Sequence, residues 1–295
     1  MDDTTPKAEP RNELLAEVGG FPPGHFYSPY PSIEEIRADA ERIWRAPAEL
    51  PRIDLRVAEQ LALLDQLSRF HGEMPFPDTR QPDFRYFFEN GFFSYADGTV
   101  LYSMLRHLEP RRVIEVGSGF SSALILDTNE RFFGGAIECT FIDPYPDQLL
   151  ELTRGEDLHR STLLRERFQS IEPGFFDSLG DGDILFVDST HVAKAGSDVN
   201  HLFFEVLPRL ATGVHVHLHD IFYPFEYPRA WVEDLRRAWS EIYLLRAFLE
   251  FNDAFAIRLF NHYLAEFHRD RVEQTLPAML RHTGGSIWLA VEGRP

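Results

Sequence analysis

The stretch RVIEVGSGFSS, residues 112–122, joins a short apolar run to a segment rich in serine. Gly117 and Gly119 let the backbone turn sharply and approach a ligand closely. Ser121, Ser122 and the free N–H groups of a helix start can donate hydrogen bonds to that ligand. A full dinucleotide fingerprint, G-x-G-x-x-G, would have glycine where this chain has Ser122. Alone, this loop is a turn that many α/β proteins contain.

Beyond this loop, apolar runs that predict strands alternate with segments of helical periodicity. Further strands are expected at residues 137–143, 163–168, 183–188, 213–220, 254–260 and 286–292, and helices at 201–210 and about 228–250. This alternation predicts parallel β-α-β units and a layered α/β sheet. Ligands of such sheets bind outside the carboxyl ends of the strands, so residues at those ends are the candidates for chemistry.

The N-terminal part of the chain has a different pattern. Residues 1–30 are rich in proline and glycine, which is typical of an arm with little regular structure. Ser32 followed by Glu35 resembles a capping box, and helices are expected at 33–44 and 56–70. We therefore predict an N-terminal arm and helical extension over residues 1–90, serving as a lid or as a dimer element, and an α/β domain over 91–295.

Composition argues against several classes of partner. The formal net charge is −18, whereas nucleic acids and anionic membrane surfaces need a positive footprint. The sequence has no run of eighteen apolar residues, so we expect no transmembrane helix. The single Cys139 and the acidic, polar N-terminus, which does not resemble a signal peptide, predict a cytoplasmic protein.

Two acidic residues narrow the interpretation of the glycine loop. Glu115 precedes Gly117 by two residues, and Asp143 ends the second predicted strand, where a carboxylate can accept both hydroxyls of a ribose. This combination resembles the class I S-adenosylmethionine-dependent methyltransferases, and the order of elements continues the resemblance from about residue 91 to the C-terminus. The resemblance implies a Rossmann-like, seven-stranded sheet whose last two strands form an antiparallel hairpin at one edge.

The same resemblance implies a set of cofactor contacts. In that family the glycine loop wraps the amino-acid end of S-adenosylmethionine, the strand-two acid holds the ribose, and the loop after strand three touches the adenine. In this sequence these cofactor-binding roles fall on Glu115, Gly117, Ser118, Gly119, Ser121, Asp143 and Gln169. Residues 183–210 and 217–228 further resemble a bacterial branch of methyltransferase-domain proteins, which supports the fold and cofactor but says little about the substrate.

Acidic residues also end the fourth and fifth predicted strands. Asp188 and Asp220 would lie side by side, about 5 Å apart by strand spacing, and oxygen-rich sites of this kind suit Mg²⁺ or Ca²⁺. The arrangement resembles the metal-dependent catechol and sugar O-methyltransferases. The D-x-x-H spacing from Asp188 to His191 matches the sugar enzymes, in which that histidine is the base. Lys194 could be the base instead if it is desolvated, since the catechol enzymes use a lysine nearby, but a lysine more often lies on the solvated surface.

The run GVHVHLHD, residues 213–220, places three histidines on one face of a strand. We expect His215 and His217 to fill that face, because only His219 and Asp220 reach the ligand edge. His219 stands where the sugar enzymes carry an acid, and a histidine with two carboxylates suits Mn²⁺, Fe²⁺ or Zn²⁺ better than Mg²⁺. The alternative is that no metal binds and that His219 is a second base or orients Asp220.

These patterns predict methyl transfer from S-adenosylmethionine to a hydroxyl of a small molecule or sugar. The expected catalytic residues are His191, Asp188 and His219, and the expected ligands of a divalent metal (Mg²⁺, Mn²⁺, Fe²⁺ or Zn²⁺) are Asp188, His219 and Asp220. Two rivals stay open: an NAD(P)-dependent oxidoreductase, which Ser122 disfavours, and a non-catalytic S-adenosylmethionine-binding protein. The residues specify neither the acceptor nor the oligomeric state.

Overall fold

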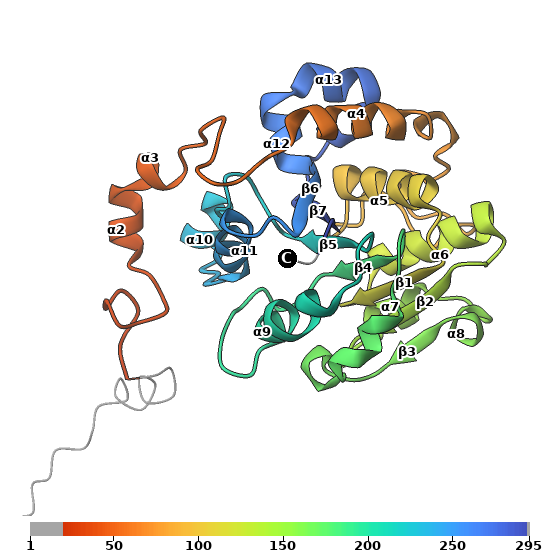
Figure 1. Ribbon diagram of the computed structural model, residues 1–295, viewed down its shortest axis with the longest axis horizontal. Helices are drawn as coiled ribbons and strands as arrows, with labels where there is room; N and C mark the ends of the chain where they lie inside the picture. The colour runs from red at the N-terminus through yellow and green to blue at the C-terminus, as the bar shows by residue number, and fades with distance from the viewer. Residues whose placement is uncertain (1–19, 294–295) are drawn as a thin grey trace, which may run out of the picture. The chain divides into compact units, whose positions relative to one another are not determined.

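The computed structural model describes residues 20–293, which contain a seven-stranded sheet of order β3-β2-β1-β4-β5-β7-β6 (Figure 1). The strands are β1 (Arg112–Val116), β2 (Glu138–Ile142), β3 (Thr162–Leu164), β4 (Ile184–Val187), β5 (His215–His219), β6 (Phe255–Phe260) and β7 (Ser286–Val291). The first five strands pair in parallel, and β7 is antiparallel to both β5 and β6. This confirms the predicted Rossmann-like sheet with an antiparallel hairpin at one edge.

Burial explains which strands the sequence predicted well. Every residue of β4 is buried, as expected for a parallel strand with both faces covered, which has a continuous apolar sequence. The edge strand β3 is shorter than predicted and ends at Leu164. Its expected continuation, residues 165–167, is charged and exposed to solvent, so no apolar side chain there favours extending the strand into the core.

Helices flank the sheet, with α4, α5, α12 and α13 gathered on one side of it at the top of Figure 1. Their bounds are α4 (Val57–Ser68), α5 (Tyr95–Leu108), α6 (Phe120–Phe133), α7 (Asp147–Leu152), α8 (Asp157–Arg160), α9 (Asp198–His201), α11 (Glu241–Glu250), α12 (Asn261–Phe267) and α13 (Arg269–Thr275). The helix predicted at 201–210 continues from α9 as a π-helical turn and then a 3₁₀ turn that contains Pro208. Proline lacks the N–H that an α-helix needs at this point.

The described chain forms two compact units. The smaller one consists of residues 20–45 and Tyr227–Trp239 and contains α2 (Ile33–Ala38), α3 (Ala40–Ile43) and α10 (Arg229–Glu233). Within it, the Trp44 indole N–H donates to the Tyr227 carbonyl at 2.8 Å. The larger unit holds the whole sheet and also residues 46–90, whereas the predicted division lay at residue 90. A lid or dimer role for the extension stays a prediction, and residues 1–19 of the expected arm lie outside the described residues.

No helix within residues 20–293 is both long and apolar enough to cross a membrane. The helical region predicted at 228–250 consists of α10 and α11, which residues 234–240 separate. This interruption matters for the site, because it allows α11 to begin as a new helix at Glu241.

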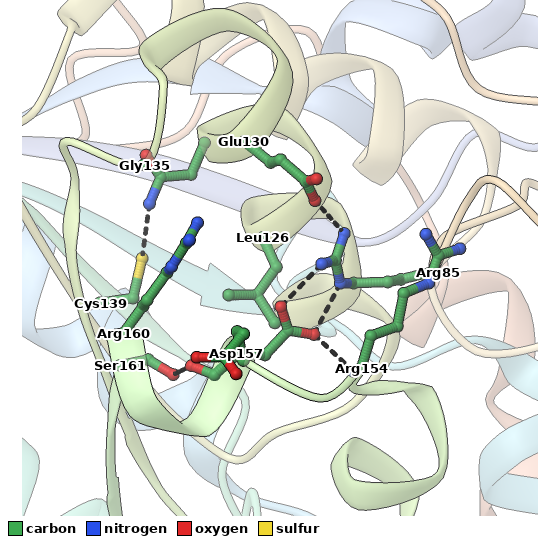
Figure 2. A pocket seen from close by; sticks show the side chains of 11 residues that line it. Arg85, Leu126, Glu130, Gly135, Cys139, Arg154, Asp157, Arg160 and Ser161 are labelled. Carbon is green, nitrogen blue, oxygen red and sulfur yellow. Dashed lines mark hydrogen bonds and ion pairs between the residues drawn. The ribbon is translucent and has the colours of Figure 1, made fainter.

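A buried ion-pair network ties the segment before α5 to α6 and α8. The Arg85 guanidinium, whose side chain is only 6% exposed, lies 2.7 Å from oxygens of Asp127, Asp157 and Glu130. Figure 2 shows Arg85 beside Glu130 and Asp157 in the wall of a pocket of about 290 Å³. One guanidinium thus satisfies three carboxylates, two of which are buried or nearly so.

We expect Arg85→Ala to lower the free energy of unfolding by about 3–5 kcal/mol, because it leaves Asp127 and Asp157 buried without their cation. Urea denaturation followed by circular dichroism measures this loss. Arg160→Ala is the matched control. Arg160 lines the same pocket but is exposed, so its loss should change stability by no more than about 0.5 kcal/mol. Equal effects of the two substitutions would contradict a stabilising role of the network.

Candidate active site

The glycine loop lies between the end of β1 and the start of α6, directly against the end of β4. Gly117 has φ +78°, in the left-handed region, and a Cβ at this residue would lie 1.9 Å from the backbone oxygen of Asp188. The Asp188 N–H donates to the Val116 carbonyl at 2.8 Å. Position 117 therefore requires glycine for its conformation and for the close approach of the two strand ends.

Asp143 follows β2 and holds the glycine loop through its carboxylate. Its Oδ2 accepts hydrogen bonds from the Ser118 backbone N–H at 2.9 Å and from the Ser118 hydroxyl at 2.8 Å. Its Oδ1 accepts from the N–H of Tyr145 at 2.8 Å, and the Tyr145 side chain is 76% exposed. The strand-two acid and the glycine loop thus form one hydrogen-bonded group at the carboxyl edge of the sheet.

Glu115 is fully buried beneath this loop. The Ser121 hydroxyl donates to Oε1, but Oε2 has no hydrogen-bond partner among residues 20–293. Burial raises the pKa of Glu115 to about 8, against the opposing effect of the hydrogen bond from Ser121. A buried oxygen without a donor needs an explanation, and a ligand that brings an N–H group or a positive charge would provide one.

The sequence singled out Gln169, but the glutamine that lies against the glycine loop is Gln148. Gln169 follows β3 and donates from Nε2 to the Gly196 carbonyl at 3.3 Å. Gln148, on α7, lies over Gly119, where a Cβ would be 2.3 Å from Oε1 of Gln148. No sequence pattern pointed to Gln148, because its position depends on how α7 packs after β2.

Three side chains converge where β4 and β5 end. His191 Nε2 lies 3.2 Å from Oδ1 of Asp188 and 3.7 Å from Oδ2 of Asp220. Each of the three residues offers one ligand atom, and these atoms all lie within 4.8 Å of one another. The carboxylates meet because β4 and β5 are adjacent parallel strands, with Val187 paired to Leu218. Such a group of atoms is compact enough to surround a single cation.

His219 lies beside this group but is not one of its three members. Its Nε2 is 3.6 Å from Oδ1 of Asp220, and its Nδ1 is buried without a hydrogen-bond partner among the described residues. Burial disfavours the charged form, yet the charges of Asp188, Asp220 and Asp97 raise the pKa of His219. Asp97 is a buried residue of α5 that the sequence analysis did not single out. It ends the aromatic-rich stretch of residues 84–97, and nothing else in the sequence pointed to it.

Of the other two histidines of β5, His217 fills space in the core, whereas His215 at the start of the strand is only partly buried. His217 is fully buried and stacks on Phe186 with ring centroids 4.0 Å apart. Burial lowers the pKa of His217 well below its usual value and lowers that of His215 to about 4. Both rings are therefore neutral near pH 7, as suits the structural role expected for them.

Glu241, the first residue of α11, is the main site residue that the sequence did not predict. Its Oε2 lies 2.8 Å from Nδ1 of His191, and both side chains are almost fully buried. Burial opposes a charge on His191, but the hydrogen bonds to Asp188 and Glu241 prevail and raise the pKa of His191 to about 10. Glu241 follows His191 by 50 residues, and only packing brings the two together.

The aromatic residues near this edge differ in exposure. Phe92 is 71% exposed and stacks on Phe120 of the glycine loop with ring centroids 6.1 Å apart. Tyr95 and Tyr223 are buried, and the Tyr223 hydroxyl donates to the Pro47 carbonyl. Of Phe92, Tyr95 and Tyr223, Phe92 alone presents its ring to solvent beside the loop. Lys194 is exposed.

Comparison with known proteins relates this chain to methyltransferases. Residues 114–221 match the family model described as a methyltransferase domain. An uncharacterised protein of Archaeoglobus fulgidus is 36% identical over 174 residues, which span 57% of this chain and 78% of that protein. The glycine loop and the strand-end acids Asp143, Asp188 and Asp220 all lie within residues 114–221, which match the methyltransferase-domain model.

Solved structures of similar architecture have low sequence identity to this chain. The S-adenosylhomocysteine-bound methyltransferase PaMTH1 of Podospora anserina is 16% identical, with 88% of this chain and 95% of that chain covered and a TM-score of 0.45. The O-methyltransferase TomG of Streptomyces achromogenes, in complex with S-adenosylmethionine, is 14% identical, with 88% and 96% covered and a TM-score of 0.42. The match that names an activity is that of residues 114–221 to the methyltransferase-domain model.

We expect Glu115→Gln to remove a pH dependence of stability. The pKa of Glu115 is about 8 in the folded protein, against an ordinary value of 4.5, so between these values the folded protein holds a proton that the unfolded chain has released. Wild-type stability should therefore fall as pH rises through this window, by about 1 kcal/mol per pH unit relative to the variant.

Urea denaturation at several pH values from about 5 to 8 measures this slope. Glu138→Gln is the control, because Glu138 is exposed and pairs with Arg112 at the surface. A stability difference between wild type and Glu115→Gln that does not vary with pH would mean that Glu115 titrates normally in the folded protein.

Proposed function

Because the chain belongs to the class I S-adenosylmethionine-dependent methyltransferases, we propose that it methylates a hydroxyl of a small molecule or sugar, with a divalent metal at the site. The observation that carries this proposal is the group of Asp188, His191 and Asp220 beside the glycine loop. The backbone of Asp188 meets that of Gly117, so candidate acceptor-binding acids lie next to the expected methyl donor.

The residues of the glycine loop fit the expected cofactor. The Oε2 of Glu115, which has no hydrogen-bond partner among the described residues, suits the amino group at the amino-acid end of S-adenosylmethionine, and Asp143 would accept the ribose hydroxyls. The backbone N–H groups in the first turn of α6 are suited to the carboxylate of that same end, whereas those of Ser118 and Gly119 donate to Asp143 and Ser122. Gln169 is the proposed contact to the adenine. The cofactor supplies a methyl group on a positively charged sulfur.

The acids at the ends of β4 and β5 fit a divalent metal. We assign two ligands to Asp188 and Asp220 and a third to His219, whose Nε2 lies 3.6 Å from Asp220 Oδ1. Two carboxylates with an imidazole favour Mn²⁺, Fe²⁺ or Zn²⁺ over Mg²⁺. The metal would supply positive charge, which acidifies a bound hydroxyl and weakens the hold of the two carboxylates on the His191 proton.

His191 is the proposed base. Its Nδ1 is held by Glu241, so Nε2 is the nitrogen directed toward Asp188 and Asp220. Once Nε2 has released its proton, an acceptor hydroxyl between this nitrogen and the glycine loop would give its own proton to Nε2. Its oxygen would form a bond to the methyl carbon as the bond from that carbon to the sulfur breaks, and S-adenosylhomocysteine would leave. The main contribution of the protein is to hold the two reactants in line.

Charge and chemistry limit the class of acceptor. The net charge of −18 disfavours nucleic acids and anionic membrane surfaces, and the acids at the site favour a neutral, hydroxyl-bearing molecule over an anion. Family membership supports methyl transfer over the nicotinamide-dependent alternative. Turnover of S-adenosylmethionine to S-adenosylhomocysteine with a panel of sugars and catechols tests catalysis against simple cofactor binding.

We expect Asp143→Ala to weaken S-adenosylmethionine binding tenfold or more, which corresponds to about 1.4 kcal/mol. The substitution removes both the ribose acceptor and the hydrogen bonds that hold Ser118. Isothermal titration calorimetry measures the dissociation constant. Glu151→Ala, an exposed acid on α7, is the control for loss of one negative charge nearby. Unchanged affinity in Asp143→Ala would refute the assigned cofactor site.

We expect the wild-type protein to bind one Mn²⁺ per chain, and Asp188→Asn and Asp220→Asn each to weaken this binding at least tenfold. Each substitution removes a charged oxygen ligand. Electron paramagnetic resonance of free Mn²⁺ gives the affinity, and Asp253→Asn, an exposed acid away from this edge, is the control. If Mg²⁺, Mn²⁺, Fe²⁺ and Zn²⁺ all fail to bind the wild type, the metal is excluded.

The same measurement separates the roles of the two histidines. His219→Gln should weaken Mn²⁺ binding, whereas His191→Gln should keep it while abolishing methyl transfer. The opposite result for metal binding would make His191 the third ligand, in keeping with its place in the three-residue group, and would assign the base to another residue.

A further inference from the structure

We propose that Glu241 is a positioning residue that fixes the His191 ring with Nδ1–H toward α11 and Nε2 toward Asp188 and Asp220. The proposal rests on the role proposed for His191 and adds a residue to which neither the sequence nor the family resemblance assigned a function. The evidence is a set of contacts between the start of α11 and the segment 189–193, all within the larger unit.

The backbone at the start of α11 holds the segment that carries His191. The N–H groups of Ser240 and Glu241 both donate to the His191 carbonyl, at 2.8 and 3.0 Å. In return, the Ser240 hydroxyl accepts from the N–H of Ala193 at 2.9 Å. The first two bonds use N–H groups that a helix start cannot satisfy internally, and together the three bonds attach the segment to α11 at the histidine and two residues after it.

The conformation of His191 shows why the segment needs such support. Its φ is +59°, in the left-handed region that residues with a Cβ seldom adopt. Conformations of this kind persist only where the surrounding structure holds them, and they gather at functional sites. At His191 this conformation is held by the hydrogen bonds from Ser240 and Glu241.

The side chain of Glu241 then determines which ring nitrogen faces the site. Oε2 lies 2.8 Å from Nδ1 of His191, and a carboxylate oxygen can only accept, so Nδ1 carries a proton. Nε2 is consequently the nitrogen presented to Asp188 and Asp220. A carboxylate behind a histidine fixes its tautomer and its orientation in the same way at metal sites.

A purely structural role would not need a carboxylate at this position. The Glu241 side chain is 2% exposed, and burying a charged group is costly unless it is paired and hydrogen-bonded. Its oxygens face the His191 ring and, at 3.5 Å, the hydroxyl of Ser189. Glu241 thus faces the ring on one side and Asp188 and Asp220 on the other, and His219 is close enough to interact with it electrostatically.

Nuclear magnetic resonance of the full-length protein tests this proposal through the Nδ1-bound proton of His191, assigned by its absence in His191→Gln. Wild type should show this proton in slow exchange and shifted downfield by its bond to a carboxylate. Glu241→Gln keeps an acceptor oxygen and should keep the resonance, moved upfield. Glu241→Ala should lose it, because the proton then exchanges with water.

Affinity for Mn²⁺ alone provides the second readout. Because His191 is proposed as the base and not as a ligand, we expect Glu241→Ala to leave this affinity unchanged, as His191→Gln should; weakening by about 10- to 100-fold would instead show that the histidine held by Glu241 is a metal ligand. Glu250→Ala is the control on the same helix, where Glu250 pairs with Arg246 at 3.0 Å. It should change neither the resonance nor the affinity, even if it lowers the melting temperature.

An Nδ1 proton that stays in slow exchange in folded Glu241→Ala would overturn the proposal. If that variant fails to fold, absence of the downfield resonance in wild type would overturn it equally. Failure of the proposed function looks different: wild type would bind neither Mn²⁺ nor S-adenosylmethionine, while the resonance would still decide the role of Glu241.

Discussion

The contact between Gly117 and the carbonyl of Asp188 is the constraint on which the rest of the site depends. A Cβ at position 117 would lie 1.9 Å from that oxygen, so any other residue would push the ends of β1 and β4 apart. With glycine, the loop that is expected to hold the methyl donor lies beside the first acid of the acceptor site. The strand order then places Asp220 next to Asp188, and the remaining geometry follows from this one close approach.

The protein satisfies its buried acids in two different ways. Away from the site, Asp127 and Asp157 share the guanidinium of Arg85, which stays charged at any accessible pH and fixes the network permanently. At the site, Asp188 and Asp220 face only imidazole rings. An imidazolium, unlike a guanidinium, can release its proton when another cation takes its place, so these acids can exchange one positive partner for another. Permanent pairing suits a scaffold, whereas exchangeable pairing suits a site that takes up a proton or a cation.

The sequence predicted the sheet and much of its active edge, but not the contacts that orient the edge. Buried parallel strands such as β4 are continuous apolar runs, and strand adjacency then brings Asp188 and Asp220 together without further information. His191, rather than His219, joins those acids because its backbone has φ +59°, which residue type does not predict. Glu241 was missed because the region 228–250 was expected to be one helix, and only the break before α11 brings this carboxylate to His191.

The pKa values of the three histidines of β5 show over what distance the carboxylates of Asp188 and Asp220 act. Along one strand face the pKa is lowered at His215 and His217 and raised at His219. Same-face neighbours are about 6.6 Å apart on a strand. Over this distance, from His217 to His219, the net effect on the histidine pKa changes from lowering by burial to raising by the nearby carboxylates. Positive charge brought to Asp188 and Asp220 would therefore act on His219 and His191 and leave His217 neutral in its aromatic stack. Chemistry at the edge can change without altering the core that supports it.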